Sequence, residues 1–373
     1  MIKKCIKNIG KVLIVIMLVV ISSSSIGCMK NKKTEKTESN SNFDIKAAGN
    51  VTDTYMKYLI KDDLENSKKL YSKDLLKSSL PQENKNLKIL GYNISEINEV
   101  GKSGLFKVRV SRSDLNNSFA SLDEYSIKIS KEDNDYKIKE TNNTVQKEVF
   151  AEGGQIRSKN KNNVNTSLVV DMDGLPTYAF PRDDKSNTDK IKVPKSKFGM
   201  VNLGYSGESL AVSTYDKDVF IGLIKIDESL EVQGGENKDQ GEKGDGAGKT
   251  NEGGGTTKGR EKPVGKEITS IDILKDCKVE VINFSPSEKF ITVQYVKPSS
   301  GKCIRVYKVD GGDIIPFKFE EKYPLDKVNV IFSSYDKENL NFDVMPKTEG
   351  DKSASNVIGK WQLSLKDFKA KKM

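Results

Sequence analysis

The 373-residue chain contains no histidine, four cysteines and one tryptophan. The absence of histidine excludes Ser-His-Asp and Cys-His nucleophile activation, histidine-ligated zinc and proton transfer by imidazole. Any catalysis would therefore depend on carboxylates, lysine, tyrosine or a bound hard cation. Because no pair of carboxylates stands out in an apolar setting, we predict that the protein is not an enzyme and has no catalytic residues and no cofactor.

Cysteine is too sparse for a metal site, and we predict none. Cys5 and Cys28 lie near the N-terminus, so only Cys277 and Cys303 belong to the body of the chain. In an exported protein these two could form one disulfide if their strands are neighbours, or they could remain as two buried thiols.

The apolar run near the N-terminus is too short to cross a membrane comfortably. Val12–Ile21 has ten residues, and a helix of that length covers about 15 Å, half of a hydrocarbon core. Four lysines and no acidic residue precede the run, which is typical of an export signal. We therefore interpret residues 1–27 as a cleaved signal peptide.

The segment SSSSIGCMK, with the small residue Gly27 directly before Cys28, resembles the lipobox of bacterial lipoproteins. The resemblance implies cleavage between Gly27 and Cys28, a diacylglycerol anchor on Cys28, and a location on the extracytoplasmic face of the cell membrane. Ser25 departs from the leucine that is usual three residues before that cysteine. The alternative is an ordinary secretory peptide that is cut elsewhere. Residues 28–43 are polar and lysine-rich, which favours a flexible tether next to an anionic membrane.

The charge pattern argues against nucleic-acid binding. The formal net charge is +9, but lysine is interspersed with aspartate and glutamate throughout, with no dense basic stripe between aromatic residues. We therefore predict no nucleic-acid partner.

Residues 44–80 have apolar side chains at helical spacings, and Asp62 or Asp63 can cap a second short helix near Leu64. From Leu87 the spacing becomes two, in LKILGYNISEI, LFKVRVSR, EYSIKIS and YKIKE, which predicts antiparallel strands buried on one face. Helices followed by a four-stranded meander resemble the nuclear-transport-factor-2-like cone of Gram-positive, clostridial-type lipoproteins. YLIKDDLENSKKLYSKDLL resembles the helical opening of that family, and DYKIKE resembles its last strand. The resemblance implies an α+β domain over residues 44–145, with a curved sheet around a pocket.

Residues 146–373 are predicted to be mostly β. Three segments share an apolar strand, an aromatic residue beside serine, a polar turn and a second apolar strand: VNLGYSGESLAV (201–212), VINFSPSEKFITV (281–293) and VIFSSYDKENLNFDV (330–344). FSPSEKFITV resembles the strand–turn–strand core of TolB-type propellers, which implies propeller-like repeats. An incomplete propeller, an open stack of sheets and a β-sandwich remain alternatives.

Two further segments complete the organisation. Residues 168–180, LVVDMDGLPTYAF, have turn chemistry at Asp173 and Gly174 between two apolar arms, which predicts a hairpin and a fourth repeat unit. Residues 234–265 are rich in glycine, and their only apolar side chains are Ala247 and Val264. We predict that this insert is disordered, because it cannot bury enough apolar surface to offset its ordering entropy.

These observations favour a membrane-anchored extracytoplasmic lipoprotein that acts as a non-catalytic binding or scaffolding module of the cell envelope. Its partners would be the membrane, through the anchor on Cys28, and an envelope protein or ligand that the sequence does not identify. Two alternatives remain open: a carboxylate-dependent hydrolase that acts on cell-wall material, and a solute-binding lipoprotein of an importer.

Overall fold

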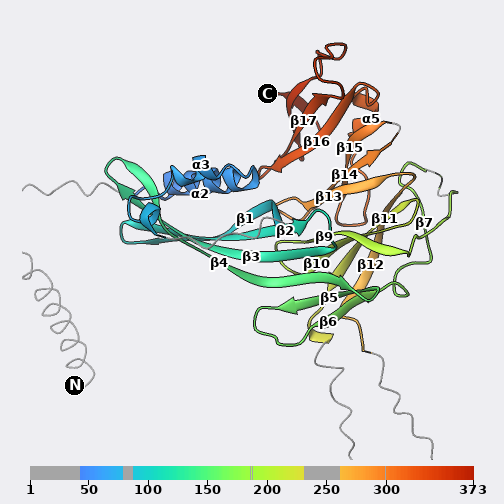
Figure 1. The fold of residues 1–373 in the computed structure, drawn as a ribbon, viewed down its shortest axis with the longest axis horizontal. Coiled ribbons are helices and arrows are strands. Elements are labelled where there is room, and N and C mark those ends of the chain that lie inside the picture. Colours follow the sequence, from blue (N-terminus) through green and yellow to red (C-terminus); the bar gives the residue numbers. More distant parts are fainter. Residues whose placement is uncertain (1–42, 79–86, 185, 187, 231–260, 299) are drawn as a thin grey trace, which may run out of the picture. The chain divides into compact units, whose positions relative to one another are not determined.

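The protein is described here from a computed structural model, which covers residues 43–78, 87–184, 186, 188–230, 261–298 and 300–373. This part of the chain is mostly β (Figure 1). The predicted signal peptide, the residues of the lipobox and most of the glycine-rich insert lie outside the described residues.

The first two helices of the described residues begin at aspartate side chains that cap them. The Asp44 carboxylate accepts hydrogen bonds from the first N–H groups of α2 (Ile45–Ile60), and Asp63 does the same for α3 (Leu64–Lys68). Two further short helices are η1 (Leu75–Lys77) and α5 (Phe319–Lys322). Asp63, one of the two caps that the sequence allows, is therefore the one used.

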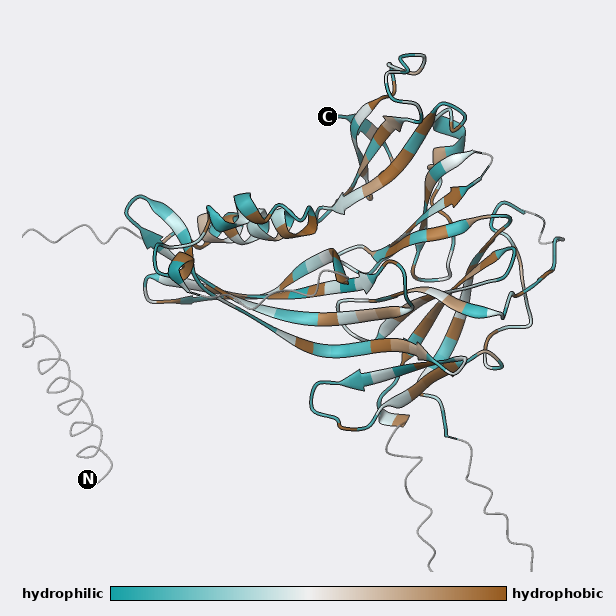
Figure 2. Ribbon diagram, viewed as in Figure 1, coloured by the Kyte–Doolittle hydropathy of each residue, from teal (hydrophilic) through white to brown (hydrophobic). Residues whose placement is uncertain are grey.

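Six antiparallel strands follow one another in a single meander, here called the long sheet. Its strands are β1 (Leu87–Val100), β2 (Ser103–Asp114), β3 (Phe119–Glu132), β4 (Asp135–Glu152), β5 (Gln155–Asn160) and β6 (Ser167–Asp171). Polar and apolar residues alternate along much of β2 and β3 (Figure 2), as the spacing of two predicts. In β1 the buried residues are consecutive, from Ile89 to Gly91. The boundary expected after residue 145 falls inside β4, and β5 and β6 extend the same sheet.

The long sheet buries opposite faces at its two ends. Val108 and Tyr125, which are paired in register, lie on the face that packs against α2. Leu122, which is paired with Ser111, belongs to the other face and packs against Val201 of the next sheet. One sheet thereby joins the helix to the β-rich remainder of the chain.

Besides the two-stranded pair β7–β8, three larger antiparallel sheets follow in chain order in the described residues, and we call them sheets I, II and III. Sheet I contains β9 (Lys197–Leu203), β10 (Ser209–Tyr215), β11 (Val219–Ile226) and β12 (Gly265–Leu274). Sheet II contains β13 (Lys278–Phe284), β14 (Phe290–Lys297) and β15 (Gly301–Lys308), and sheet III contains β16 (Val328–Tyr335), β17 (Asn339–Pro346), β18 (Gly359–Ser364) and β19 (Ala370–Lys372). Each is a propeller-like meander, and side chains of all three share one apolar core.

The shared pattern of an aromatic residue beside serine aligns Tyr205, Phe284 and Phe332, and the strand register corrects this alignment. Leu203, Phe284 and Tyr335 are equivalent, since each is the last residue of a first strand that pairs across its hairpin. Tyr205 lies beyond β9, in the turn, and Phe332 lies three residues before Tyr335. The three repeats that the sequence indicates are therefore present, but their aromatic residues do not occupy one structural position.

The hairpin expected over residues 168–180 is not formed. β6 pairs with β5, whereas β7 (Tyr178–Ala179) pairs with β8 (Ile191–Lys192). The predicted turn does form, with Gly174 N donating to Asp171 Oδ1 at 2.8 Å, but its two arms are held by different partners.

The end of the insert also differs from the prediction. Val264 is buried and Gly265 begins β12, so the C-terminal end of residues 234–265 belongs to the ordered sheet.

Two fully buried asparagines at equivalent positions join the sheets. Asn202 Nδ2 donates to Ile282 O of sheet II at 2.8 Å, and Asn283 Nδ2 donates to Leu90 O of the long sheet at 2.8 Å. Since a buried amide without a partner costs about 1–3 kcal/mol, these bonds fix how the three sheets meet.

Gly91 lies at that junction, and a side chain there should be destabilising. An added Cβ would overlap the buried Tyr205 hydroxyl and lie 3.1 Å from Asn283 Nδ2. We expect Gly91→Ala to lower the free energy of unfolding by about 1–3 kcal/mol in urea titrations. The matched control is Gly49→Ala in α2, where the nearest atom would be at 3.6 Å and the gain in helix propensity predicts up to about 1 kcal/mol of stabilisation. Equal effects of the two substitutions would contradict this description of the junction.

Candidate binding cleft between sheets I and II

A buried carboxylate, Asp272, stands at the outer strand of sheet I. It occupies an apolar stretch of β12, between Ile271 and Ile273, and its side chain is fully buried. Asp272 Oδ1 accepts the main-chain N–H groups of Arg182 and Ile273, both at 2.8 Å. Its Oδ2 accepts Arg305 Nη1 at 2.9 Å and the Tyr307 hydroxyl at 2.5 Å. Four donors use the full accepting capacity of the carboxylate.

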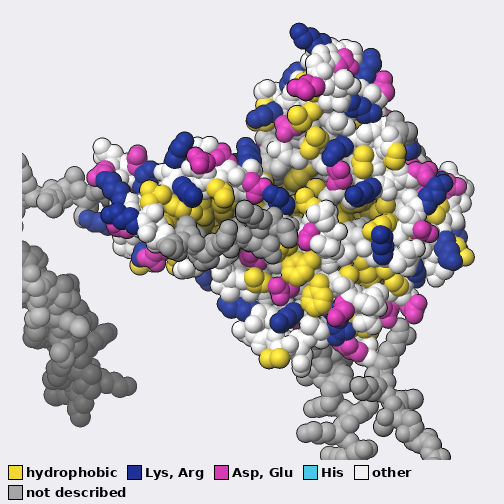
Figure 3. Space-filling view, in the orientation of Figure 1, with side chains coloured by type: hydrophobic (Ala, Val, Ile, Leu, Met, Phe, Trp, Pro, Cys, Tyr) yellow, Lys and Arg dark blue, Asp and Glu magenta, His cyan; other side chains and the backbone are white. Residues whose placement is uncertain are grey.

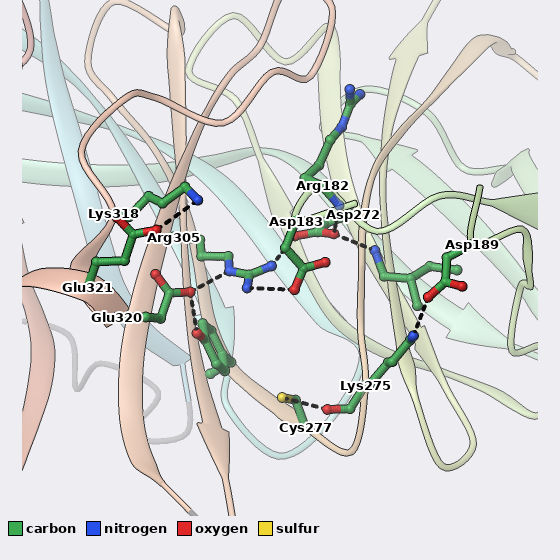
Figure 4. Close-up of polar contacts among 12 residues, drawn as sticks. Arg182, Asp183, Asp189, Asp272, Lys275, Cys277, Arg305, Lys318, Glu320 and Glu321 are labelled. Atoms are coloured by element: carbon green, nitrogen blue, oxygen red, sulfur yellow. Dashed lines mark hydrogen bonds and ion pairs between the residues drawn. The ribbon is translucent and has the colours of Figure 1, made fainter. Parts of the chain in front are cut away.

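Arg305 lies on β15 and faces sheet I, two residues before Tyr307 on the same side of the strand. Its guanidinium also binds Glu320 of α5, at 2.6 Å from Nε, and approaches Asp183 at 3.4 Å from Nη2 (Figure 4). Tyr295 of the neighbouring strand donates its hydroxyl to Glu320 at 2.7 Å. One arginine therefore connects sheet I, sheet II, α5 and the segment between β7 and β8.

The residues joined by these contacts are here called the Arg305 cluster: Asp183, Asp272, Tyr295, Arg305, Tyr307 and Glu320. The directions in which the pKa values of Asp272 and Tyr307 shift follow from burial and from contact with neighbouring charges. Burial raises the pKa of Asp272, while the Arg305 guanidinium and the donors that contact the carboxylate act in the opposite direction. Burial also raises the pKa of Tyr307, and the neighbouring Asp272 carboxylate raises it further. Tyr307 is therefore a hydrogen-bond donor at neutral pH.

The cluster forms one wall of a cleft of about 420 Å³. That volume is within the range of small-molecule sites in proteins. The residues that line the cleft are Asp183, Ile273, Leu274, Lys275, Cys277, Tyr295, Lys297, Ser300, Gly301, Arg305, Glu320 and Leu325. Apolar side chains therefore line part of the cleft, and charged side chains of both signs line the rest.

The charged side chains along the rim of the cleft differ in how fully they are paired with side chains of opposite charge. Lys275 pairs with Asp189 at 2.7 Å, and Arg305 is in contact with three carboxylates. Asp183 has a side chain that is 63% exposed. Lys297 is exposed, and among the described residues no carboxylate lies within ion-pair distance of its amine.

Cys277 and Cys303 are both free thiols, so the possible disulfide is not formed. Cys303 lies within β15, while Cys277 precedes β13, and β14 runs between those two strands. Two strand spacings correspond to about 10 Å, beyond the Cα separation that a disulfide spans. Burial raises the pKa of Cys277 to about 11 and that of Cys303 to about 12. The alternative of two buried thiols holds in full for Cys303, whereas Cys277 is only partly buried and lines the cleft.

A second cavity, of about 530 Å³, lies where β4 of the long sheet meets sheet I. Its three lysines are already paired: Lys147 with Glu228, Lys225 with Glu267 and Lys266 with Asp227. Ile226 is the single apolar side chain of its lining. With its three lysines already paired and a single apolar side chain in its lining, this cavity is the weaker candidate.

The sequence contained one signal for the Arg305 cluster that our sequence analysis missed. An aspartate between two isoleucines, as in Ile271–Asp272–Ile273, is the apolar setting in which a buried carboxylate is expected. No sequence signal placed Arg305 or Glu320 beside it, since they lie 33 and 48 residues away in the chain. Gly27 and Cys28, the predicted cleavage and lipidation residues, lie outside the described residues.

On the face shown in Figure 3, basic and acidic side chains are interspersed with apolar ones, without an extended patch of one sign. Within the described residues, no helix combines the length and the apolarity that crossing a membrane requires. The same residues contain no group of three or more acidic or cysteine side chains that could hold a metal ion.

No protein-family model and no curated protein matches the chain. Among solved structures it is similar to TolB from Acinetobacter baumannii (7% identity, TM-score 0.23), over 65% of this chain and 57% of that one. It is also similar to the WD40 domain of SCAP from fission yeast (10% identity, TM-score 0.29; 79% and 66% covered) and to Kluyveromyces lactis Hsv2 (10%, 0.27; 81% and 91%). The chain thus spans little more than half of the length of the TolB chain.

Removing the buried carboxylate should be far more costly than removing the exposed one. We expect Asp272→Ala to lower the free energy of unfolding by about 3–5 kcal/mol, because Arg305 and Tyr307 lose a buried partner. Asp183→Ala should change it by less than about 0.5 kcal/mol. Urea unfolding followed by the fluorescence of Trp361, which stacks on Phe342, measures both. A loss below 1 kcal/mol for Asp272→Ala would show that the cluster does not hold the two sheets together.

Cys277 should react slowly with alkylating reagents in the folded chain. A pKa of about 11 gives a thiolate fraction at pH 8 about 100-fold below that of a thiol with a pKa near 9. We expect iodoacetamide labelling of Cys277, measured by peptide mass spectrometry, to be slow at pH 8 and to accelerate as the pH approaches 11. The urea-unfolded chain is the control. Rapid labelling of Cys277 at pH 8, or recovery of a Cys277–Cys303 disulfide, would contradict the structure.

Proposed function

We propose that the protein is a lipoprotein of the cell envelope, anchored on the extracytoplasmic face of the membrane through Cys28, and that it acts as a non-catalytic binding module. The leader pattern and the lipobox resemblance support the anchor. The cleft between sheets I and II supports the binding role and is the site that we assign to it.

The observation that carries the proposal is the saturation of Asp272, the buried carboxylate that Arg305 contacts behind the wall of the cleft. All four accepting positions of Asp272 are occupied, and its side chain is fully buried. A carboxylate in this state has no accessible lone pair for a reactant, whereas a general acid or base must reach the proton that it transfers. Groups that are fixed before a ligand arrives favour binding, because little conformational entropy is lost on association.

The resemblance of residues 44–145 to a nuclear-transport-factor-2-like cone forms part of this proposal. It is supported by α2, which packs on one face of the long sheet. β5 and β6 depart from the four-stranded pattern of that family.

The anchor is tested by the mass and the location of the native protein. We expect the mature chain to begin at Cys28, to carry a diacylglycerol group and to fractionate with membranes, because two acyl chains give stable attachment. Cys28→Ser should release the chain or leave it unprocessed, whereas Cys277→Ser should leave fractionation unchanged. An unprocessed N-terminus, or an unacylated chain cut elsewhere and found in the medium, would refute the anchor.

A further inference from the structure

The distribution of charge in the cleft assigns a class of ligand, and this inference rests on the proposed binding function. We propose that the cleft binds a short zwitterionic peptide, with its free amino group at the Asp183–Glu320 end and its carboxylate at Lys297.

The acidic end is defined by the contacts of Arg305. Asp272, Glu320 and Asp183 all contact this one guanidinium, so the carboxylates outnumber the positive charge that they share. The Asp272 side chain is fully buried and cannot contact a ligand. The side chains of Asp183 and Glu320 are 63% and 26% exposed, so these two carboxylates can. An ammonium group entering the cleft would meet these two carboxylates.

The basic end lies along the same sheet face. Arg305 is paired with Val293 on β14, and Lys297 is four residues further along that strand, opposite Gly301. Four residues of a strand span about 13 Å, so about this distance separates the carboxylates at one end of the cleft from the lysine at the other end. Lys275, the other lysine of the lining, is already paired with Asp189, so among the residues that the structure describes Lys297 is the lysine of the lining that a carboxylate can approach.

Apolar and aromatic side chains line much of the rest of the cleft, among them Leu274, Tyr295 and Leu325. Tyr295 lies between Val293 and Lys297 on β14 and is almost fully buried, with its hydroxyl held by Glu320. An extended peptide rises about 3.4 Å per residue, so two or three residues, with the reach of the side chains at either end, fit the separation. A ligand with charge of only one sign would leave one end of the cleft unmatched.

The test is a calorimetric titration of the full chain, in mild detergent at low ionic strength, with three probes: trialanine, N-acetyl-trialanine and trialanine amide. We expect trialanine to bind and each cap to weaken binding about tenfold, since each removes one charged contact. In Asp183→Asn the acetyl cap should make little further difference, while the amide cap still weakens binding. Lys297→Gln should show the reverse pattern.

Both substituted side chains are at the rim, so the variants should fold as the parent does. Asp367→Asn and Lys369→Gln, which remove an exposed pair joined at 3.7 Å and outside the cleft, are the matched controls and should bind like the parent. Equal affinity for all three probes, or no binding of trialanine up to millimolar concentration, would overturn the assignment of a zwitterionic peptide.

Mass spectrometry of the recovered peptide separates this inference from the proposed function. Intact trialanine without binding refutes the ligand class and leaves a non-catalytic module in place. Cleaved trialanine refutes the non-catalytic function itself.

Discussion

The contact between Asp272 and Arg305 is the interaction on which the interface of sheets I and II depends. Two opposite charges removed from water are tolerated only when their hydrogen bonds are complete, and here two main-chain N–H groups and a tyrosine hydroxyl complete them. This requirement ties together parts of the chain that are distant in sequence: β12, β15 and the segment that contains Arg182. The main chain around Asp272 and Arg305, at the Asp183–Glu320 end of the cleft, is thereby fixed in position.

The same principle operates at the other junctions between sheets. Asn202 and Asn283 bind main-chain oxygens across the sheets, and buried Lys147 binds Gly207 O at 2.8 Å where the long sheet meets sheet I. Apolar burial supplies most of the attraction between the stacked sheets, but it is not directional. The buried polar groups supply direction, because each must find a particular partner. A molecule built from similar meanders thus gains one defined arrangement, and with it the cleft between sheets I and II.

Much of the local structure was predictable. Period-two alternation indicated the first four strands, Asp63 caps a helix at one of the two positions that the sequence allowed, and the three strand–turn–strand repeats are all present. The sequence-based predictions were wrong where the structure of a segment depends on which strand it pairs with. The turn at residues 171–174 forms as expected, yet its arms pair with β5 and β8 instead of with each other. Likewise, the sequence pattern aligns Tyr205, Phe284 and Phe332 with one another. The strand register instead aligns Leu203, Phe284 and Tyr335.

By itself the sequence determined the properties that depend on neighbours in the chain or on composition: the leader pattern, the lack of histidine chemistry, the strand periods and the helix caps. Tertiary structure alone decided which charges meet. Asp272, Arg305 and Glu320 are ordinary members of their own segments, and their roles arise only when β12, β15 and α5 are brought into contact. Electrostatic and hydrogen-bonding energies depend on distances through space and on exclusion from water, and neither quantity is written in the order of residues.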